Sequence, residues 1–211
     1  MDMTKYYNFA DEALDEDEII KAASQVFANC NDPKYNKKVF EVLKQSAIKL
    51  SNPLIYFYLA RCYHTGCGGS KNILAAQKWY WKSFEGGNAD SYAYLAEIYL
   101  YGDDTIIDTG VSYNYFKKAA EAGSSRGYFG LGLFYQSRSM YKEAEEFYTK
   151  GILLGGDEYK KCADNGDAFA CLNIAICIHC GYGYSDCCDY YYLEMADKLG
   201  NIDAHEILVD L

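Results

Sequence analysis

The sequence predicts an all-α protein made of stacked helical repeats, because one pattern of residues occurs twice, 36 positions apart. The first copy comprises Leu59-Ala60, Tyr63, Gly66, Gly68, Asn72, Ala76, Trp79-Tyr80, Ser83 and Gly87. The second comprises Leu95-Ala96, Tyr99, Gly102, Asp104, Asp108, Ser112, Tyr115-Phe116, Ala119 and Gly123. A period of roughly 20 to 50 residues with constant small and aromatic positions is typical of supersecondary units that stack on one another.

Within each copy, the spacing of the apolar residues indicates helices rather than strands. Tyr56, Leu59-Ala60 and Tyr63 stand at positions i, i+3, i+4 and i+7, which form one face of a helix. The glycines that follow permit positive φ and stop this first helix. On the predicted second helix, the small residues Ala76 and Ser83 flank bulky aromatic rings and let the paired helices approach closely. A single unit would expose its apolar face, so we expect the units to stack.

Other parts of the chain continue the pattern less completely. A third unit with a shorter loop follows from Leu131-Gly132, and a fourth begins at Ile174-Ala175. Upstream, helix candidates at 17–29 and 37–50 form a degenerate repeat around a turn. The stretch 157–165 is not accounted for by the period, and we interpret it as an inserted short helix.

The predicted organisation follows from these assignments. It consists of an acidic N-terminal segment (1–15), a degenerate N-terminal repeat (16–52), repeats at 53–88 and 89–124, a repeat with a short loop (125–156), the inserted short helix (157–166), a further repeat (167–201) and a C-terminal cap helix (202–211). No Pro- or Ser-rich linker divides the chain, so its 211 residues, half of them apolar, are expected to form one elongated domain.

The recurring residues resemble the Sel-1-like repeat, a relative of the tetratricopeptide repeat with a longer glycine-bearing loop. The resemblance rests on the pattern LA-x-x-Y-x-x-G-x-G, followed by A-x-x-W-Y-x-x-S and a terminal Gly, and it covers residues 53–200. It implies an α/α solenoid, a right-handed superhelix of about five stacked helix-turn-helix repeats, two of them degenerate. It also implies an adaptor or scaffold role, without naming a partner.

The charge of the chain restricts the classes of partner. The formal net charge is −10, and an acidic surface without a basic stripe repels phosphate backbones, so nucleic acid is a poor partner. Basic partners are favoured. The N-terminal carboxylates at 11–18 fit a solvated helix start, although a docking patch is the alternative. No apolar run spans a membrane, and no secretory leader is visible at the N-terminus, so we expect a cytoplasmic protein.

Nine cysteines raise two other possibilities. Cys162 and Cys171 resemble the disulfide pair of secreted Sel-1-like proteins, but the corresponding positions in the other repeats are not cysteines, and free thiols are expected. Cys177, Cys180 and Cys187-Cys188 supply enough thiolates for a zinc site. The repeat register instead assigns Cys177 to an apolar core column, so no metal and no cofactor are predicted.

Catalytic motifs are absent from the sequence, and we do not expect an enzyme. His64 and His179 each lie five residues after the anchor residues Leu59 and Ile174, which favours a shared surface row over a unique catalytic base. The segment 66–71 superficially resembles a phosphate-binding loop, but it follows a helix and lacks the Gly-Lys-Ser/Thr order.

A row of side chains on the first helices is the predicted interaction surface. If these helices line the concave side, their exposed positions form an aromatic and apolar groove that suits an extended peptide or a partner helix. The residues predicted to bind the partner are Tyr58, Arg61, His64, Tyr94, Glu97, Phe129, Gln136, Asn173, Ile176 and His179. The alternative for each is packing between neighbouring repeats.

Two functional hypotheses follow. The first is a protein–protein interaction scaffold or adaptor that binds a protein or peptide partner through its concave face. The second is an inhibitor or immunity-type protein that neutralises a basic effector through its acidic surface. The oligomeric state is left open by the sequence.

Overall fold

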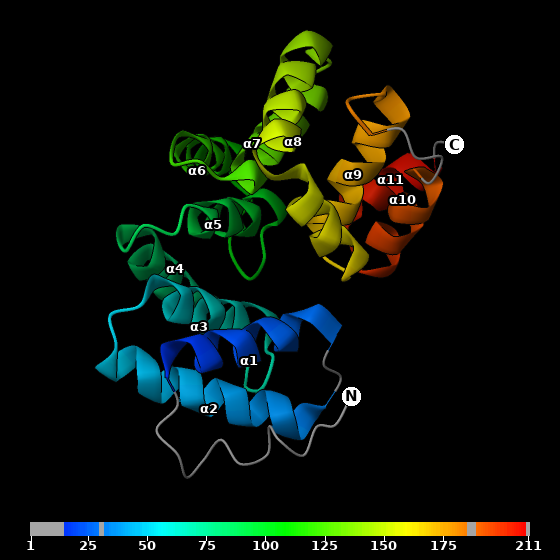
Figure 1. Cartoon of the computed structure of the whole chain (residues 1–211). Helices are drawn as coiled ribbons and strands as arrows, with labels where there is room; N and C mark the ends of the chain where they lie inside the picture. The colour runs from blue at the N-terminus through cyan, green and yellow to red at the C-terminus, as the bar shows by residue number, and fades with distance from the viewer. Residues whose placement is uncertain (1–14, 30–31, 185–188, 210–211) are drawn as a thin grey trace. The chain divides into compact units, whose positions relative to one another are not determined.

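The computed structural model describes residues 15–29, 32–184 and 189–209, and within these ranges all regular secondary structure is helical. The helices are α1 (Glu16–Asn29), α2 (Pro33–Lys49), α3 (Pro53–Thr65), α4 (Ile73–Glu85), α5 (Asp90–Tyr101), α6 (Thr109–Glu121), α7 (Ser125–Gln136), α8 (Tyr141–Asp164), α9 (Ala168–Cys180), α10 (Asp189–Lys198) and α11 (Ile202–Val209) (Figure 1). The predicted all-α fold class is confirmed.

The 36-residue pattern is visible in the way the second helices begin. Asn72 precedes α4 and Asp108 precedes α6, and the side chain of each accepts a hydrogen bond of 2.9 Å from the backbone amide three residues later. These bonds satisfy amides that a helix start otherwise leaves unpaired. The backbone amides of the same two residues donate to the carbonyls of Tyr63 and Tyr99, at 2.8 and 2.9 Å. The repeated residues therefore build the same turn twice.

The end of the first helix also repeats. Gly66 after α3 has φ 76°, and Gly102 after α5 has φ 68°, a left-handed conformation that glycine adopts without steric cost. Two residues on, Gly68 has φ 77° and Asp104 has φ 49°. Aspartate tolerates this region better than most residues do, which explains how the second copy can carry Asp in place of Gly.

The contacts divide the chain into two compact units. Unit 1 comprises residues 1–91 and 103–105, and unit 2 comprises residues 92–102 and 106–211. In unit 1, α1, α2 and α3 enclose an apolar core that is lined by Ile19, Ala22, Ala23, Val26, Tyr35, Val39, Phe40, Leu43, Ala47, Ile55, Leu59 and Cys62. The small residue Ser83 of α4 was predicted to let the paired helices approach closely. It is buried, and its hydroxyl donates to the carbonyl of Pro53 in α3 at 2.6 Å.

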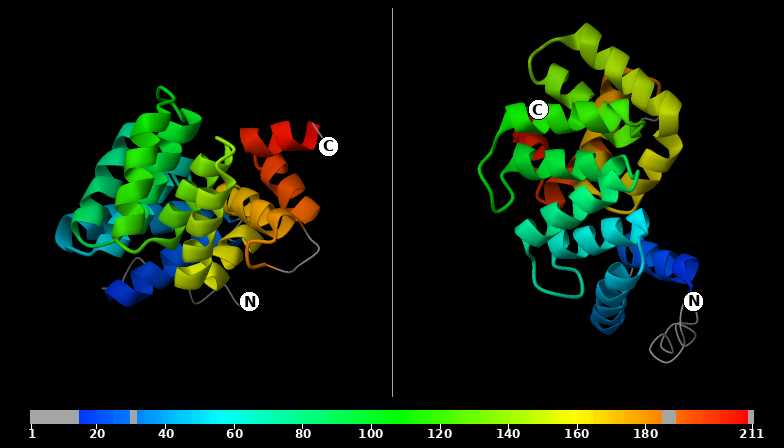
Figure 2. Two further views of the ribbon diagram at one scale, coloured as in Figure 1. Left: turned by 90° about the horizontal axis from the view of Figure 1, so that it is seen from above. Right: turned by 90° about the vertical axis from the view of Figure 1, so that its left-hand side faces the viewer.

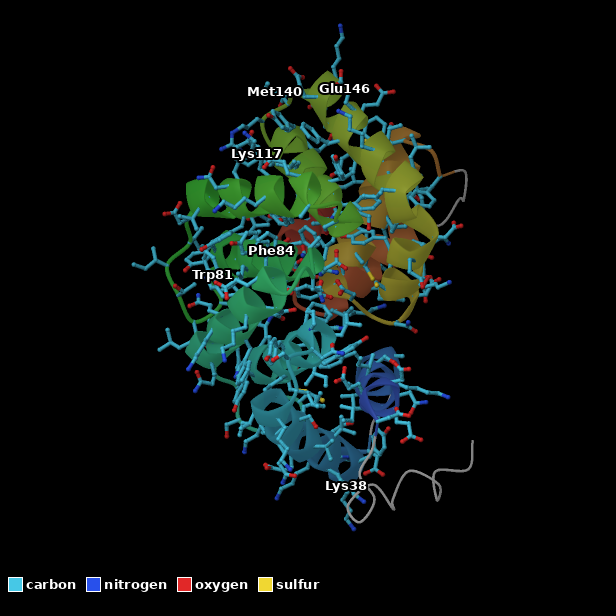
Figure 3. The ribbon with its side chains drawn as sticks, turned by 60° about the vertical axis from the view of Figure 1, so that its left-hand side comes forward. Lys38, Trp81, Phe84, Lys117, Met140 and Glu146 are labelled. Carbon is cyan, nitrogen blue, oxygen red and sulfur yellow. The ribbon has the colours of Figure 1, made fainter. Side chains whose placement is uncertain are left out.

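In unit 2, successive helices from α6 to α11 pack against one another along the chain, and Figure 2 shows them from two further directions. Helices α6 and α7 approach closely because glycines face the neighbouring rings. A Cβ atom built at Gly130 would lie 2.2 Å from the ring of Phe116. On the outside, Lys117 of α6 and Glu146 of α8 are exposed to solvent (Figure 3).

Residues 157–164 belong to the stretch that the repeat period left unassigned, and they are helical and continue α8. The backbone leaves helical geometry at Gly155, with φ −174° and ψ 37°, and residues 157–164 form the last turns of the helix. This part contributes Tyr159 and Ala163 to the interior, 3% and 0% exposed. Tyr184 donates a hydrogen bond of 2.8 Å to the carbonyl of Gly156 and ties the segment to the chain beyond α9.

Cys162 and Cys171 are not joined by a disulfide in the described structure. Cys177 is fully buried, as the repeat register predicts for a core column. Burial raises the pKa of Cys62 and of Cys171 to about 12, which keeps both thiols protonated and unreactive. Cys187-Cys188 lie outside the described residues. Within the described ranges, no group of three or more His, Cys, Asp or Glu residues is placed to hold a metal ion.

Among the described helices, none combines the length and the apolar character that a membrane span needs.

Candidate functional site

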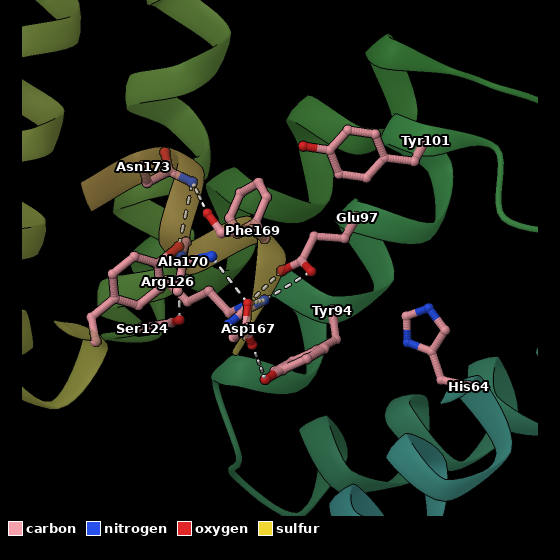
Figure 4. A network of polar contacts seen from close by, with 12 residues as sticks. His64, Tyr94, Glu97, Tyr101, Ser124, Arg126, Asp167, Phe169, Ala170 and Asn173 are labelled. Atoms are coloured by element: carbon pink, nitrogen blue, oxygen red, sulfur yellow. Dashed lines mark hydrogen bonds and ion pairs between the residues drawn. The ribbon is translucent and has the colours of Figure 1, made fainter. Parts of the chain in front are cut away.

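The inner part of unit 2 is built around a buried arginine. Arg126 on α7 is 4% exposed and forms two ion pairs. Its Nε and Nη2 donate to Glu97 of α5, the latter at 2.9 Å, and its Nη1 and Nη2 donate to Asp167 before α9, both at 2.9 Å (Figure 4). Burial alone lowers the pKa of Arg126, but Asp167 and Glu97 outweigh burial and hold it well above its ordinary value. The guanidinium is therefore a permanent internal cation.

Aromatic rings complete this cluster. The guanidinium carbon of Arg126 lies 4.1 Å from the ring centre of Tyr94 and 5.1 Å from that of Phe169. The hydroxyl of Tyr94 donates to Asp167 at 3.4 Å. Asp167 also caps α9 by accepting from the amide of Ala170 at 3.0 Å. The predicted binding residues Tyr94 and Glu97 thus lie together, but they satisfy an internal cation.

Two further predicted residues lie in the interior. Phe129 is fully buried and stacks on Tyr159, with ring centres 4.0 Å apart. Asn173 is fully buried, and its amide donates to the carbonyl of Phe169 at 2.8 Å and to the hydroxyl of Tyr159 at 3.4 Å. The expectation that Phe129 and Asn173 are exposed is wrong. Tyr159, from the stretch that the repeat period did not explain, covers both of them.

The predicted residues of unit 1 are half-buried. Tyr58 stacks on Phe27 of α1 at 6.1 Å, and the guanidinium of Arg61 lies 4.0 Å from the centre of the same ring. Both side chains therefore pack against the neighbouring helix pair, which was the alternative interpretation for this row.

His64 bridges two polar partners in unit 1. Its Nδ1 lies 3.2 Å from the hydroxyl of Tyr80, and its Nε2 lies 2.9 Å from Asp103. Asp103 also pairs with Lys71. The hydrogen bond from His64 is the main cause that lowers the pKa of Asp103, and Lys71 lowers it further. These side-chain contacts connect α3 and the loop that follows it to residues 103–105.

An open pocket in unit 2 brings the remaining three predicted residues together. Its volume is about 240 Å³. It is lined by residues at the end of α7 and along α9, α10 and α11: Gln136, Ala175, Ile176, His179, Cys180, Asp189, Tyr190, Leu193 and Ile207. We name it the α9–α11 pocket. It is our candidate functional site, because the rest of the predicted row in unit 2 is enclosed.

The polar groups of the α9–α11 pocket are only partly satisfied. Gln136 donates through Nε2 to the sulfur of Cys180 at 3.9 Å, whereas its Oε1 is buried and has no hydrogen-bond partner among the described residues. At the rim, His179 Nδ1 lies 3.1 Å from Asp189, and this hydrogen bond is the main cause that lowers the pKa of Asp189. Tyr190 is 57% exposed beside them. The pocket therefore offers a carboxylate at its rim above an apolar floor.

The sequence did not reveal several residues that make these sites. Arg126 lies in the first turn of α7, where the preceding copies carry Asp90 and Leu54, so the period gave no signal for it. Asp167 stands at the capping position that the other copies fill with Asn88 and Ser124, so the period indicated its cap but not its ion pair. Leu193 and Ile207 belong to α10 and α11, which were predicted as helices but not as pocket walls. An isolated arginine in an otherwise apolar helix was the available signal, because such a residue needs buried counter-charges.

Comparisons with known proteins agree with this architecture. A Sel1 repeat protein from Oxalobacter formigenes superposes with a TM-score of 0.53 and 21% sequence identity, over 90% of this chain and 86% of that one. The chain has the Sel1-like repeat fold. A protective antigen of uropathogenic Escherichia coli strains with an SLR fold is 26% identical, at a TM-score of 0.50. That similarity covers 86% of this Sel1-like repeat chain and 38% of the antigen.

Comparisons of the sequence alone gave no such match. No protein-family model matches it, and the search of curated proteins found no match. The fold assignment therefore rests on the repeat pattern and on the superposed structures.

Proposed function

We propose that this Sel1-like repeat chain is a protein-interaction scaffold that binds a protein or peptide partner at the α9–α11 pocket. One observation carries the proposal: Gln136, Ile176 and His179 line an open pocket, while the neighbouring inner face of unit 2 is filled by its own side chains. Apolar pockets with a few polar groups at the rim are the usual form of a recognition site. The proposed binding surface is therefore restricted to the last part of the predicted row, which consists of Gln136, Ile176 and His179.

Packing explains why the rest of the row is a poor binding surface. The residues Tyr94, Glu97, Phe129 and Asn173 are at most 9% exposed, and a partner could reach Tyr94 and Glu97 only by displacing the ion pairs of Arg126. Breaking such buried pairs is strongly unfavourable. The α9–α11 pocket requires no such rearrangement.

Reconstitution of a complex tests this proposal. The tagged wild-type chain and the variant Ile207→Lys/Tyr190→Ser are used for affinity capture from the cells that express the chain, and each captured protein is purified and titrated by calorimetry. Both substituted residues are exposed pocket residues, 37% and 57%, so the variant is expected to fold. We expect a purified partner to bind the wild type one-to-one and to lose most of its affinity for the variant.

The other results would contradict the proposal at different points. A partner that binds wild type and variant equally would place the interface elsewhere on the chain. If no purified protein binds the wild type, the scaffold function itself is wrong.

A second candidate is an inhibitor of a basic effector, which the net charge of −10 favours. Electrostatic complementarity of this kind gives fast association that weakens steeply with salt. Measuring the partner's affinity at low and high salt, and its own activity with and without the chain, separates the two candidates. A partner whose activity is unchanged in the complex supports the scaffold. A cytoplasmic location remains part of the proposal, to be checked by fractionation.

A further inference from the structure

The volume of the α9–α11 pocket limits what it can hold. Its volume of about 240 Å³ is below the roughly 300–1,000 Å³ of sites that enclose a whole drug-sized ligand. It corresponds to about eight water molecules at their liquid volume. A space of this size fits one bulky side chain of a larger partner.

The floor of the pocket is aliphatic. Ala175 and Ile176 come from α9, Leu193 from α10 and Ile207 from α11. Ile176 and Leu193 are 8% and 6% exposed, so they form the inner walls, whereas Ile207 at 37% lies at the opening. An apolar side chain that enters removes apolar surface of both partners from water, which favours binding. The floor therefore selects an aliphatic or aromatic group.

Gln136 closes one side of the pocket. Its Oε1 has no hydrogen-bond partner among the described residues and is covered by its surroundings, so it gives a ligand no hydrogen bond as the pocket stands.

A carboxylate at the opening favours a cation. Asp189 lies there, 3.1 Å from His179 Nδ1, and the other carboxylates of α10 and α11, Glu194, Asp197, Asp203 and Glu206, do not line the pocket. Asp189 itself lines the pocket, and among the described lining residues none is Lys or Arg. A ligand with a positive charge next to its apolar group is therefore attracted, and an acidic one is repelled.

We propose that the α9–α11 pocket recognises a peptide segment in which a bulky apolar side chain stands next to Lys or Arg. The inference rests on the proposed function and describes the chemistry of its partner. The apolar side chain fills the aliphatic floor, and the cation faces Asp189.

A set of designed peptides tests the chemistry directly. Labelled peptides of one length carry Trp, Leu or Ala at the centre of a Gly/Ser sequence, with Lys, Ser or Glu as the neighbouring residue. Binding is followed by anisotropy and by methyl NMR signals of Ile176, Leu193 and Ile207, which detect affinities as weak as about 1 mM. We expect peptides with Trp or Leu beside Lys to bind at least about tenfold more tightly than those with Ala or Glu.

Matched variants locate the interaction. Asp189→Asn should reduce the preference for Lys over Ser. Glu206→Gln makes the same charge change as Asp189→Asn on exposed surface of α11 that does not line the pocket, and it should leave the preference intact. Circular dichroism confirms that each variant is folded.

Failure of this inference can be told apart from failure of the scaffold function. If a purified natural partner binds at the pocket but acidic or purely polar peptides bind as well as apolar-basic ones, the ligand chemistry is wrong and the scaffold stands. Absence of methyl shifts with every peptide also overturns the inference. Concentration-dependent self-association that Ile207→Lys abolishes would replace the peptide by a second copy of the chain.

Discussion

Helix α9 contributes to two regions of unit 2 that differ in whether they are open to solvent. On one side, Asn173 faces the closed interior around Arg126, where an arginine, two carboxylates and several rings neutralise one another. One turn later, Ile176 and His179 line the open α9–α11 pocket, whose Gln136 carbonyl is unpaired among the described residues. Both regions contain an unpaired buried oxygen, since Asn173 Oδ1 also has no partner among the described residues. The pocket differs from the interior because its apolar residues lie at an opening.

The strongest test of the closed region removes its cation. Arg126→Met leaves Glu97 and Asp167 in the interior without their counter-charge, and we expect a loss of about 3–5 kcal/mol in the free energy of unfolding, as for other broken buried pairs. Urea unfolding monitored by circular dichroism measures the loss. Lys142→Met, on an exposed residue of α8, is the control and should change stability by less than about 0.5 kcal/mol. Equal effects of the two variants would refute the closed, charge-satisfied interior.

A second prediction concerns the close packing next to that interior. In Gly130→Ala the new methyl group would overlap the ring of Phe116, and overpacking of this kind costs about 1–3 kcal/mol. Gly110→Ala, near the start of α6, has only the Asp108 side chain nearby, at 3.3 Å. It should be neutral or stabilise by up to about 1 kcal/mol through helix propensity. Thermal unfolding of both variants decides the point; a stable Gly130→Ala protein would mean that α6 and α7 are not tightly packed.

Substitutions in the half-buried row of unit 1 should change stability less than those in the closed interior and more than those at the α9–α11 pocket. Because His64 lowers the pKa of Asp103, the ionised carboxylate stabilises the fold above its unfolded-state pKa of about 3.9, and this contribution is lost as the pH falls through the lower folded-state pKa. Asp103 is 28% exposed, so after solvent screening we expect only about 0.2–1 kcal/mol.

The measurement compares Asp103→Asn with the wild type at about pH 6 and about pH 3. The difference in stability should be present at the higher pH and shrink at the lower one. Asp104→Asn, at the more exposed neighbour with 68% exposure, should show a smaller difference at both. If the stability difference between Asp103→Asn and the wild type increased as the pH was lowered, the assigned pairing of Asp103 with His64 would be wrong.

The smallest effect on stability is expected at the α9–α11 pocket. Ile207→Lys/Tyr190→Ser changes exposed residues and should shift the free energy of unfolding by no more than about 0.5 kcal/mol per site, while it abolishes binding. Chemical unfolding and the calorimetric titration are carried out on the same preparation. A large loss of stability would show that these residues belong to the core and that the pocket is a packing defect.

The repeat register predicted local structure well and distant contacts poorly. The glycines at 66 and 102 and the caps Asn72 and Asp108 were visible in the sequence because they act within one turn of the chain. The burial of Tyr94 was not, because it depends on Asp167, 73 positions away. The same holds for Asn173, which is covered by Tyr159 from a stretch outside the period. A pattern that repeats between neighbours contains no information about contacts that skip a repeat.

Asp167 has a consequence for the way unit 2 unfolds. In an ideal solenoid each repeat touches only its neighbours, so the ends fray and the repeats open almost independently. Here a single carboxylate starts α9 and also clamps α7 and α5, and Asn201 before α11 donates to the hydroxyl of Tyr101 at 3.0 Å across 100 positions. Unit 2 should therefore lose its structure cooperatively, and amide hydrogen exchange should show α5, α7 and α9 opening together.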